Sequence, residues 1–141
     1  MGQSSAPGNT CLSAVRAGAT GAITGLINQS KGCGALSAMV RLIAQGEEIV
    51  PAACHTLRLL AEHPHPDGRA IHNSGTVRLL GAALELLGNT PARAEIFWQL
   101  GEGWTGDEAL AIGVYATGAA SSFEDAVRLA ANHDGDSDSP A

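Results

Sequence analysis

Apolar residues recur every three or four positions in several separate stretches of the chain, and polar residues or glycines divide these stretches. This spacing places the apolar side chains on one face of a helix, whereas a half-buried strand would alternate apolar and polar residues. No stretch shows a convincing strand pattern. The spacing predicts helices over residues 11–18, 35–43, 47–62, 68–87, 92–100, 105–116 and 121–132.

Capping residues mark the beginnings of the last two predicted helices. A capping box pairs a hydroxyl residue with an acidic residue three positions later, and each satisfies a backbone N–H group of the other. Thr105 with Glu108 fits this pattern, and so does Ser121 with Glu124. Phe123 then opens the apolar stripe that we expect to bury the last helix.

The composition favours helices that pack closely together. The chain has 141 residues, of which 45% are hydrophobic but only 4% aromatic, so Ala, Leu and Gly supply most of the apolar content. Small side chains let helix backbones approach, and Leu fills the space between them. We therefore predict an all-α fold, an orthogonal multi-helix bundle, formed by a single domain over residues 1–141. Within it, residues 1–8 are expected to be a mobile lead-in and residues 133–141 an acidic tail.

The charge and the cysteine content of the chain indicate which partners it can bind and in which compartment it resides. The net charge is −6 and no basic cluster occurs, which argues against a nucleic-acid polymer as partner. No apolar run approaches the roughly 20 residues of a membrane helix, and no signal pattern opens the chain. The three cysteines are widely spaced, as is typical of free thiols. These features predict a soluble, cytoplasmic protein without a membrane partner.

The most distinctive stretch is the acidic end, residues 133–139. Asp134, Asp136 and Asp138 alternate with small residues, and Gly135 frees the backbone. Several oxygen atoms can converge on a hard cation such as Mg²⁺ or Ca²⁺ from such a stretch. Taken alone, the same composition is also typical of a solvated acidic tail.

Two further stretches are candidates for ligand binding. Residues 28–34 form a polar, Gly-punctuated loop directly before a predicted helix, and a helix N-terminus favours a phosphate. An ordinary connecting loop is the default interpretation of this pattern. His63 and His65 alternate with Pro64 and Pro66 where a helix ends, so they are either ligand-binding groups or exposed residues of a loop.

Four stretches, in this order, resemble the ADP-ribosylglycohydrolase family of the dinitrogenase-reductase-activating type. They are residues 5–13, 28–34, 101–112 and 132–139. The last of them is similar to the family's Gly-Asp-Ser/Thr-Asp-Ser/Thr signature.

The resemblance implies an all-helical enzyme with two magnesium ions. Such enzymes hydrolyse the N- or O-glycosidic bond between the anomeric ribose carbon of ADP-ribose and an acceptor group, so the implied partner is ADP-ribose or an ADP-ribosylated protein or small molecule. By motif, Asp136, Asp138 and Ser139 are the implied metal ligands. The implied substrate-binding residues are Ser30, Gly32, Cys33 and Gly34, together with His63 or His65.

The sequence also departs from the family pattern. The N-terminal Thr-Asp-Asp-Thr motif is missing, so the chain resembles only the C-terminal part of a family member, and Pro140 follows Ser139 where the family continues into a helix. We therefore expect magnesium to bind weakly or not at all and hydrolysis to be impaired. The alternative is a noncatalytic helical module that binds ADP-ribose or another partner. Helix faces left uncovered would favour self-association.

Overall fold

The computed structural model describes residues 33–62, 75–89 and 94–133. These ranges contain helices and no strand, so the predicted all-α fold class is confirmed. None of the helices in these ranges is long and apolar enough to cross a membrane. The elements are α2 (Cys33–Ala44), α3 (Ile49–Glu62), α4 (Gly75–Asn89), the 3₁₀ helix η3 (Ala94–Gln99), α5 (Gly106–Ala119) and α6 (Phe123–Ala131).

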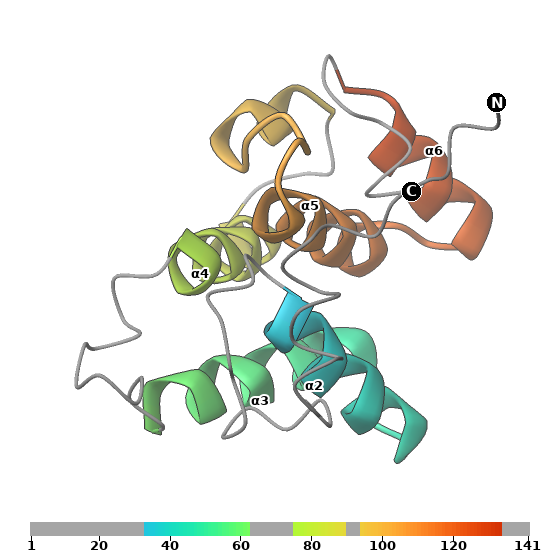
Figure 1. The fold of residues 1–141 in the computed structure, drawn as a ribbon. Coiled ribbons are helices and arrows are strands. Elements are labelled where there is room, and N and C mark those ends of the chain that lie inside the picture. Colours follow the sequence, from blue (N-terminus) through green and yellow to red (C-terminus); the bar gives the residue numbers. More distant parts are fainter. Residues whose placement is uncertain (1–32, 63–74, 90–93, 134–141) are drawn as a thin grey trace, which may run out of the picture.

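The helices are arranged in three tiers (Figure 1). The middle tier is the pair α4 and α5, which make the most extensive contact in the described structure. On one side of this pair lie α2 and α3, which cross each other, and on the other side lie η3 and α6. The middle pair is therefore covered on two sides.

The two helices of the middle tier run in the same direction. At their beginnings, the carboxylate of Asp107 on α5 lies against Gly75, the first residue of α4. At their ends, Gly118 of α5 lies against the side chain of Leu87 on α4. Because contacts join first turn to first turn and last turn to last turn, α4 and α5 are parallel, and the segment between them carries the chain back.

Helix α3 runs in the opposite sense to this pair. Val50, at the beginning of α3, lies beside Gly118 at the end of α5. Leu60, near the end of α3, belongs to the same apolar cluster as Leu80 and Leu110 from the early turns of α4 and α5. The end of α3 therefore lies near the beginnings of α4 and α5.

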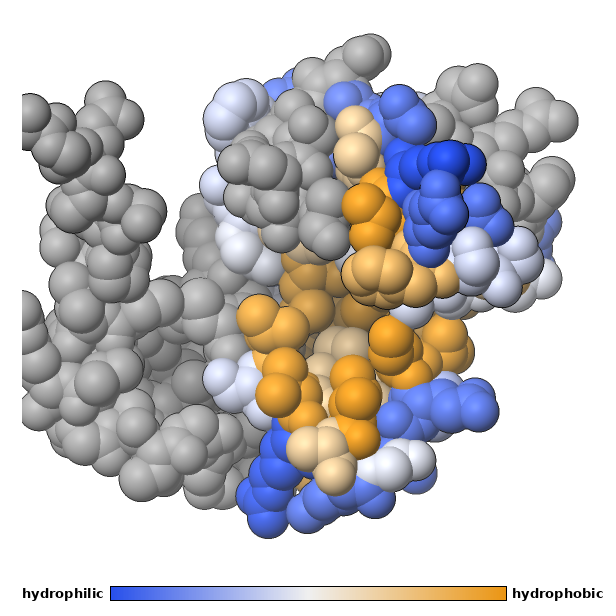
Figure 2. Space-filling model, turned by 90° about the vertical axis from the view of Figure 1, so that its right-hand side faces the viewer, coloured by the Kyte–Doolittle hydropathy of each residue, from blue (hydrophilic) through white to orange (hydrophobic). Residues whose placement is uncertain are grey.

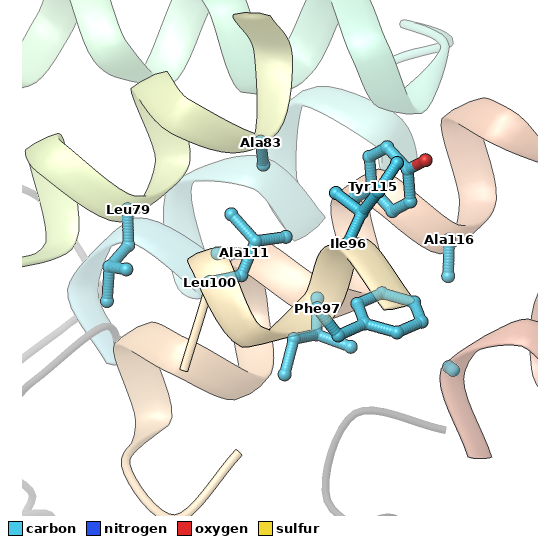
Figure 3. Close-up of a cluster of buried hydrophobic side chains, with 10 residues drawn as sticks. Leu79, Ala83, Ile96, Phe97, Leu100, Ala111, Tyr115 and Ala116 are labelled. Atoms are coloured by element: carbon cyan, nitrogen blue, oxygen red, sulfur yellow. The ribbon is translucent and has the colours of Figure 1, made fainter. Parts of the chain in front are cut away.

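Two apolar clusters hold the tiers together. The first joins α2 and α3 to the middle tier, and its buried members are Ala35, Met39, Ala53, Leu60, Leu80, Leu110 and Val114. The second joins the middle tier to η3 and α6, and its buried members are Leu79, Ala83, Ile96, Phe97, Leu100, Ala111, Ile112, Tyr115, Ala116 and Ala130 (Figure 3). Adjacent leucines of α4 fall in different clusters, as expected of a helix that is buried on two sides.

Phe97 is the central aromatic side chain of the second cluster. Its ring meets that of Tyr115 edge to face, with centroids 5.5 Å apart and an interplanar angle of 89°. This is a favoured geometry for aromatic pairs. The segment around Phe97 was predicted as a short helix over residues 92–100, and the structure shows the tighter 3₁₀ form over Ala94–Gln99.

The predicted cap of α5 is confirmed. Thr105 is the N-cap residue, and its backbone N–H donates a hydrogen bond to the Glu108 carboxylate at 3.3 Å. Asp107 and Glu108 also place negative charge in the first turn, where the helix dipole favours it.

The predicted cap of α6 is wrong by one residue. Ser122, not Ser121, is the N-cap residue, and its hydroxyl accepts a hydrogen bond from the backbone N–H of Asp125 at 3.1 Å. Ser121 instead donates its hydroxyl hydrogen to the Asp125 carboxylate at 2.9 Å. Glu124 lies one turn before Arg128 and pairs with it on the surface. Phe123 was expected in the buried stripe, but it is 85% exposed because the stripe begins only at Ala126.

We predict that Phe97 and Phe123 contribute very differently to stability. Phe97 is 1% exposed and Phe123 is 85% exposed. Phe97→Ala should lower the free energy of unfolding by about 3–5 kcal/mol, because it leaves a cavity in the second cluster. Phe123→Ala is the matched control and should stay within about 0.5 kcal/mol of wild type. Urea denaturation measures both, and equal losses would contradict the assigned core.

The cap of α6 predicts a pH effect. Side-chain hydrogen bonds with Ser121, which has the largest effect, and with Ser122 hold the pKa of Asp125 below its usual value. The stabilisation is therefore present above the ordinary aspartate pKa of about 3.9 and is lost as the pH falls through the lower folded-state pKa. Ser121→Ala should raise the Asp125 pKa, as followed by NMR titration of its carboxyl carbon. Thr117→Ala, whose hydroxyl binds the Gly113 carbonyl instead, should leave it unchanged.

Candidate functional site

Most of the predicted site residues lie outside the described residues. This is the case for Ser30 and Gly32 of the loop, for His63 and His65, and for the metal ligands Asp136, Asp138 and Ser139. Cys33 and Gly34 are the first two residues of α2. The structure therefore describes only the helices that precede and follow the predicted site residues in the sequence.

The beginning of α2 is the first of the helix ends that border predicted site residues. Residues 28–34 were predicted to lead into a helix N-terminus, and α2 indeed begins at Cys33. The first N–H groups of a helix have no partner within the helix, and its dipole favours negative charge at this end. The first turn of α2 contains no acidic residue that would offset this effect. Such an end can accept a phosphate oxygen.

The end of α3 is the second helix end that borders predicted site residues. The helix ends at Glu62, directly before His63, as the sequence predicted. Another histidine of this helix, His55, is already engaged, because its Nδ1 lies 3.0 Å from the Glu47 carboxylate. His55 therefore has a local partner at the opposite end of α3 from the predicted histidine pair.

The beginnings of α4 and α5 lie near the end of α3 and contain a buried carboxylate. Asp107, in the first turn of α5, is only 8% exposed. Its Oδ2 lies 2.6 Å from the position that a Cβ atom would take on Gly75. Its Oδ1 is buried and has no hydrogen-bond partner among the described residues. No sequence pattern singles out Asp107, because only the folded chain brings α4 against it.

The end of α6 sets the starting point of the acidic stretch. Asn132 caps the helix, and its side-chain amide donates to the carbonyl of Arg128 at 2.8 Å. His133 is half-buried, and its ring lies 5.6 Å from that of Phe97. The chain therefore enters the acidic stretch beside η3.

The loop between η3 and α5 is a second feature that was not among the predicted site residues. Gly101 and Gly103 adopt φ angles of 103° and 82°, in the left-handed region that favours glycine. The loop presents Trp104, which is 68% exposed and whose indole N–H donates to the Glu102 carboxylate at 3.0 Å. A flat aromatic face held in this way can stack on a planar group of a ligand. An exposed Trp beside two glycines was the available clue in the sequence.

Metal ligands are not gathered among the described residues. Within 33–62, 75–89 and 94–133, no three His, Cys, Asp or Glu side chains come together in a way that could hold a metal ion. The predicted ligands belong to the stretch that follows α6.

Comparison with known proteins shows the family to which this chain belongs. The sequence model of a family described as ADP-ribosylglycohydrolase matches residues 20–141, a span that includes every described helix. The chain therefore belongs to the ADP-ribosylglycohydrolase family, a family of hydrolases that act on ADP-ribose linkages. The family expected from the sequence is thereby confirmed. No match to the chain was found among curated proteins or among solved structures.

We predict that the loop before α5 tolerates no side chain at Gly101. A Cβ atom there would lie 2.5 Å from the Glu108 side chain, which caps α5, and the φ angle of 103° disfavours any other residue. Gly101→Ala should lower the free energy of unfolding by about 1–3 kcal/mol. Gly88→Ala is the control, because nothing lies within 4 Å of its added Cβ in α4. Chemical denaturation compares the two variants, and a neutral Gly101→Ala would show that the loop is not held by this contact.

Proposed function

We propose that this chain is an ADP-ribosyl hydrolase of the dinitrogenase-reductase-activating type, acting on the N- or O-glycosidic bond between ADP-ribose and an acceptor. The observation that carries the proposal is the family match over residues 20–141, together with an all-helical fold in the described part of that span. The substrate would be an ADP-ribosylated protein or small molecule.

For binding the diphosphate of ADP-ribose, we assign the loop that leads into α2. Ser30, Gly32, Cys33 and Gly34 are the proposed contacts, and the absence of acidic residues from the first turn of α2 supports an anionic ligand there. We assign His63 or His65, which follow the end of α3, to the same substrate.

For magnesium, we assign Asp136, Asp138 and Ser139 as ligands. Hard oxygen donors are the ligands that Mg²⁺ prefers, and an ion held by three such groups would keep several of its waters. When bound, magnesium would orient a water molecule and the ribose hydroxyls and would offset charge that develops at the anomeric centre. The Thr-Asp-Asp-Thr motif of the family does not occur in the sequence, so we propose weak metal binding and impaired hydrolysis.

A noncatalytic ADP-ribose-binding or interaction module is the second candidate function. The same missing motif favours it, because a binding module needs the loop and the histidines but not a complete metal site. Supplying a polypeptide with the missing motif in trans separates the two: recovered hydrolysis favours the enzyme, and binding without hydrolysis favours the module.

Self-association is a further part of the proposal, and an exposed stripe on α2 supports it. Leu36, Val40 and Ile43 recur at helical spacing, so they share one face, and each of the three is exposed. Apolar side chains also gather in one area of the face shown in Figure 2. Such areas commonly mark interaction surfaces.

We predict that the chain binds ADP-ribose and that Mg²⁺ binding depends on the acidic stretch. Isothermal titration calorimetry should detect ADP-ribose binding, and Asp136→Asn or Asp138→Asn should weaken Mg²⁺ binding by about tenfold or more. Glu85→Gln is the control, because it removes an exposed carboxylate from α4.

A sensitive assay of ADP-ribose release, with magnesium and an ADP-ribosylated peptide, should show little or no turnover. Efficient turnover would contradict the expected impairment. Failure to bind ADP-ribose would contradict the hydrolase and the ADP-ribose-binding module, and would leave only the interaction module.

A further inference from the structure

Helix α2 is apolar on its exposed side as well as on its buried side. The helix packs on α3 and α5, and its buried residues are Ala35, Ala38, Met39 and Leu42. On the exposed side, Leu36, Val40 and Ala44 follow one another at intervals of four residues. Residues at this interval form a ridge that runs obliquely along a helix, and such ridges are the surfaces through which helices pack on each other.

The exposed side of α2 also carries little charge. Helix α2 contains no Asp or Glu, and Arg41 is its only charged residue. Each of the other described helices contains at least one carboxylate. The chain has a net charge of −6, so two copies repel each other where carboxylates meet. Among the described helices, α2 is therefore the one through which two copies approach with the least repulsion, whereas a basic partner would be attracted to the other helices.

The order of large and small side chains along α2 is complementary to a second copy of the helix that runs in the opposite direction. When two antiparallel copies cross at Val40, residues at equal distances before and after Val40 lie opposite each other. Leu36 then faces Ala44 of the second copy, and Ile43 faces Ser37 of the second copy. Each large side chain has a small one opposite it, so the two helices can approach closely. A parallel pair would place Leu36 against Leu36 and leave a gap between the two Ala44 side chains.

We propose that the chain forms a dimer through α2, in which the two copies of the helix run antiparallel and Val40 lies on the two-fold axis. The same surface is used by both copies, as a closed two-fold contact requires. The inference rests on the self-association that the proposed function includes, and it adds the helix, the direction and the residue on the axis. Since the contact spans only one short helix in each copy, the dimer is weak and reversible.

A carboxylate on the axis tests the proposal. Val40→Glu places two negative charges opposite each other, so it should raise the dimer dissociation constant by about tenfold or more, measured by sedimentation equilibrium over a range of concentrations. Phe123→Glu is the matched control, because Phe123 is an exposed apolar residue on α6 and the change in net charge is the same. Its dissociation constant should stay within about twofold of wild type.

Disulfide crosslinking tests the residue on the axis. A disulfide requires two Cα atoms closer than about 7 Å, and only a residue near the axis meets its own copy at such a distance. In a chain whose Cys11, Cys33 and Cys54 are replaced by Ser, Val40→Cys should form a covalent dimer on mild oxidation. Arg41→Cys is the control, because the next residue points away from the ridge by about 100°. It should crosslink much more slowly.

Three results would overturn the dimer. If the wild type self-associates but Val40→Glu does so as strongly as Phe123→Glu, or if the two cysteine variants crosslink equally fast, the copies meet elsewhere and only this inference is wrong. If the wild type is monomeric at the highest attainable concentration, the proposed self-association is wrong as well. A monomer that Val40→Glu makes easier to unfold would show that the same chain covers the ridge. The binding of ADP-ribose is measured separately, so none of these results decides the proposed hydrolase function.

Discussion

The close parallel packing of α4 and α5 is the constraint on which the described structure depends. Parallel neighbours in a chain require a return segment, and η3 with its loop supplies it. The approach is close at both ends because glycines leave room, Gly75 for the Asp107 carboxylate and Gly118 for Leu87 and Val50. A side chain at Gly118 would lie within 3 Å of both neighbours. The beginning of α3 and the ends of α4 and α5 therefore meet at Gly118.

This central pair also determines which ends of the other helices can meet. Because α4 and α5 are buried on two sides, α3 must pack on one side of them and α6 on the other. The direction of α3 then brings its end to the beginnings of α4 and α5, whereas α6 ends beside η3, with His133 against Phe97. Helices α3 and α6, which precede the histidine pair and the acidic stretch in the sequence, thus lie in different tiers, and both pack on the middle one.

Much of this architecture could be predicted from the sequence because helix periodicity and capping are local properties. The α5 cap at Thr105 is an example, and the ordered motifs led to the family that the comparison confirms. The α6 cap was missed because Ser121 and Ser122 are adjacent and each has an acidic residue three positions later. Packing of Ala126 and Ala130 against the core selects Ser122. The environment of Asp107 could not be predicted, because Gly75 is distant in the sequence.

The exposed apolar side chains of the stripe on α2 limit how strongly two chains could associate through it. Leu36, Val40 and Ile43 are between 39% and 56% exposed, so roughly half of the gain from burying each side chain is still available. Full burial of such a residue contributes about 1.5–3 kcal/mol, so three half-buried residues retain about 3 kcal/mol per chain, and two facing stripes about 6 kcal/mol. Association costs about 4–15 kcal/mol in lost translational and rotational freedom. The stripe alone therefore supports only weak self-association, and a stable complex requires additional contact area beyond α2.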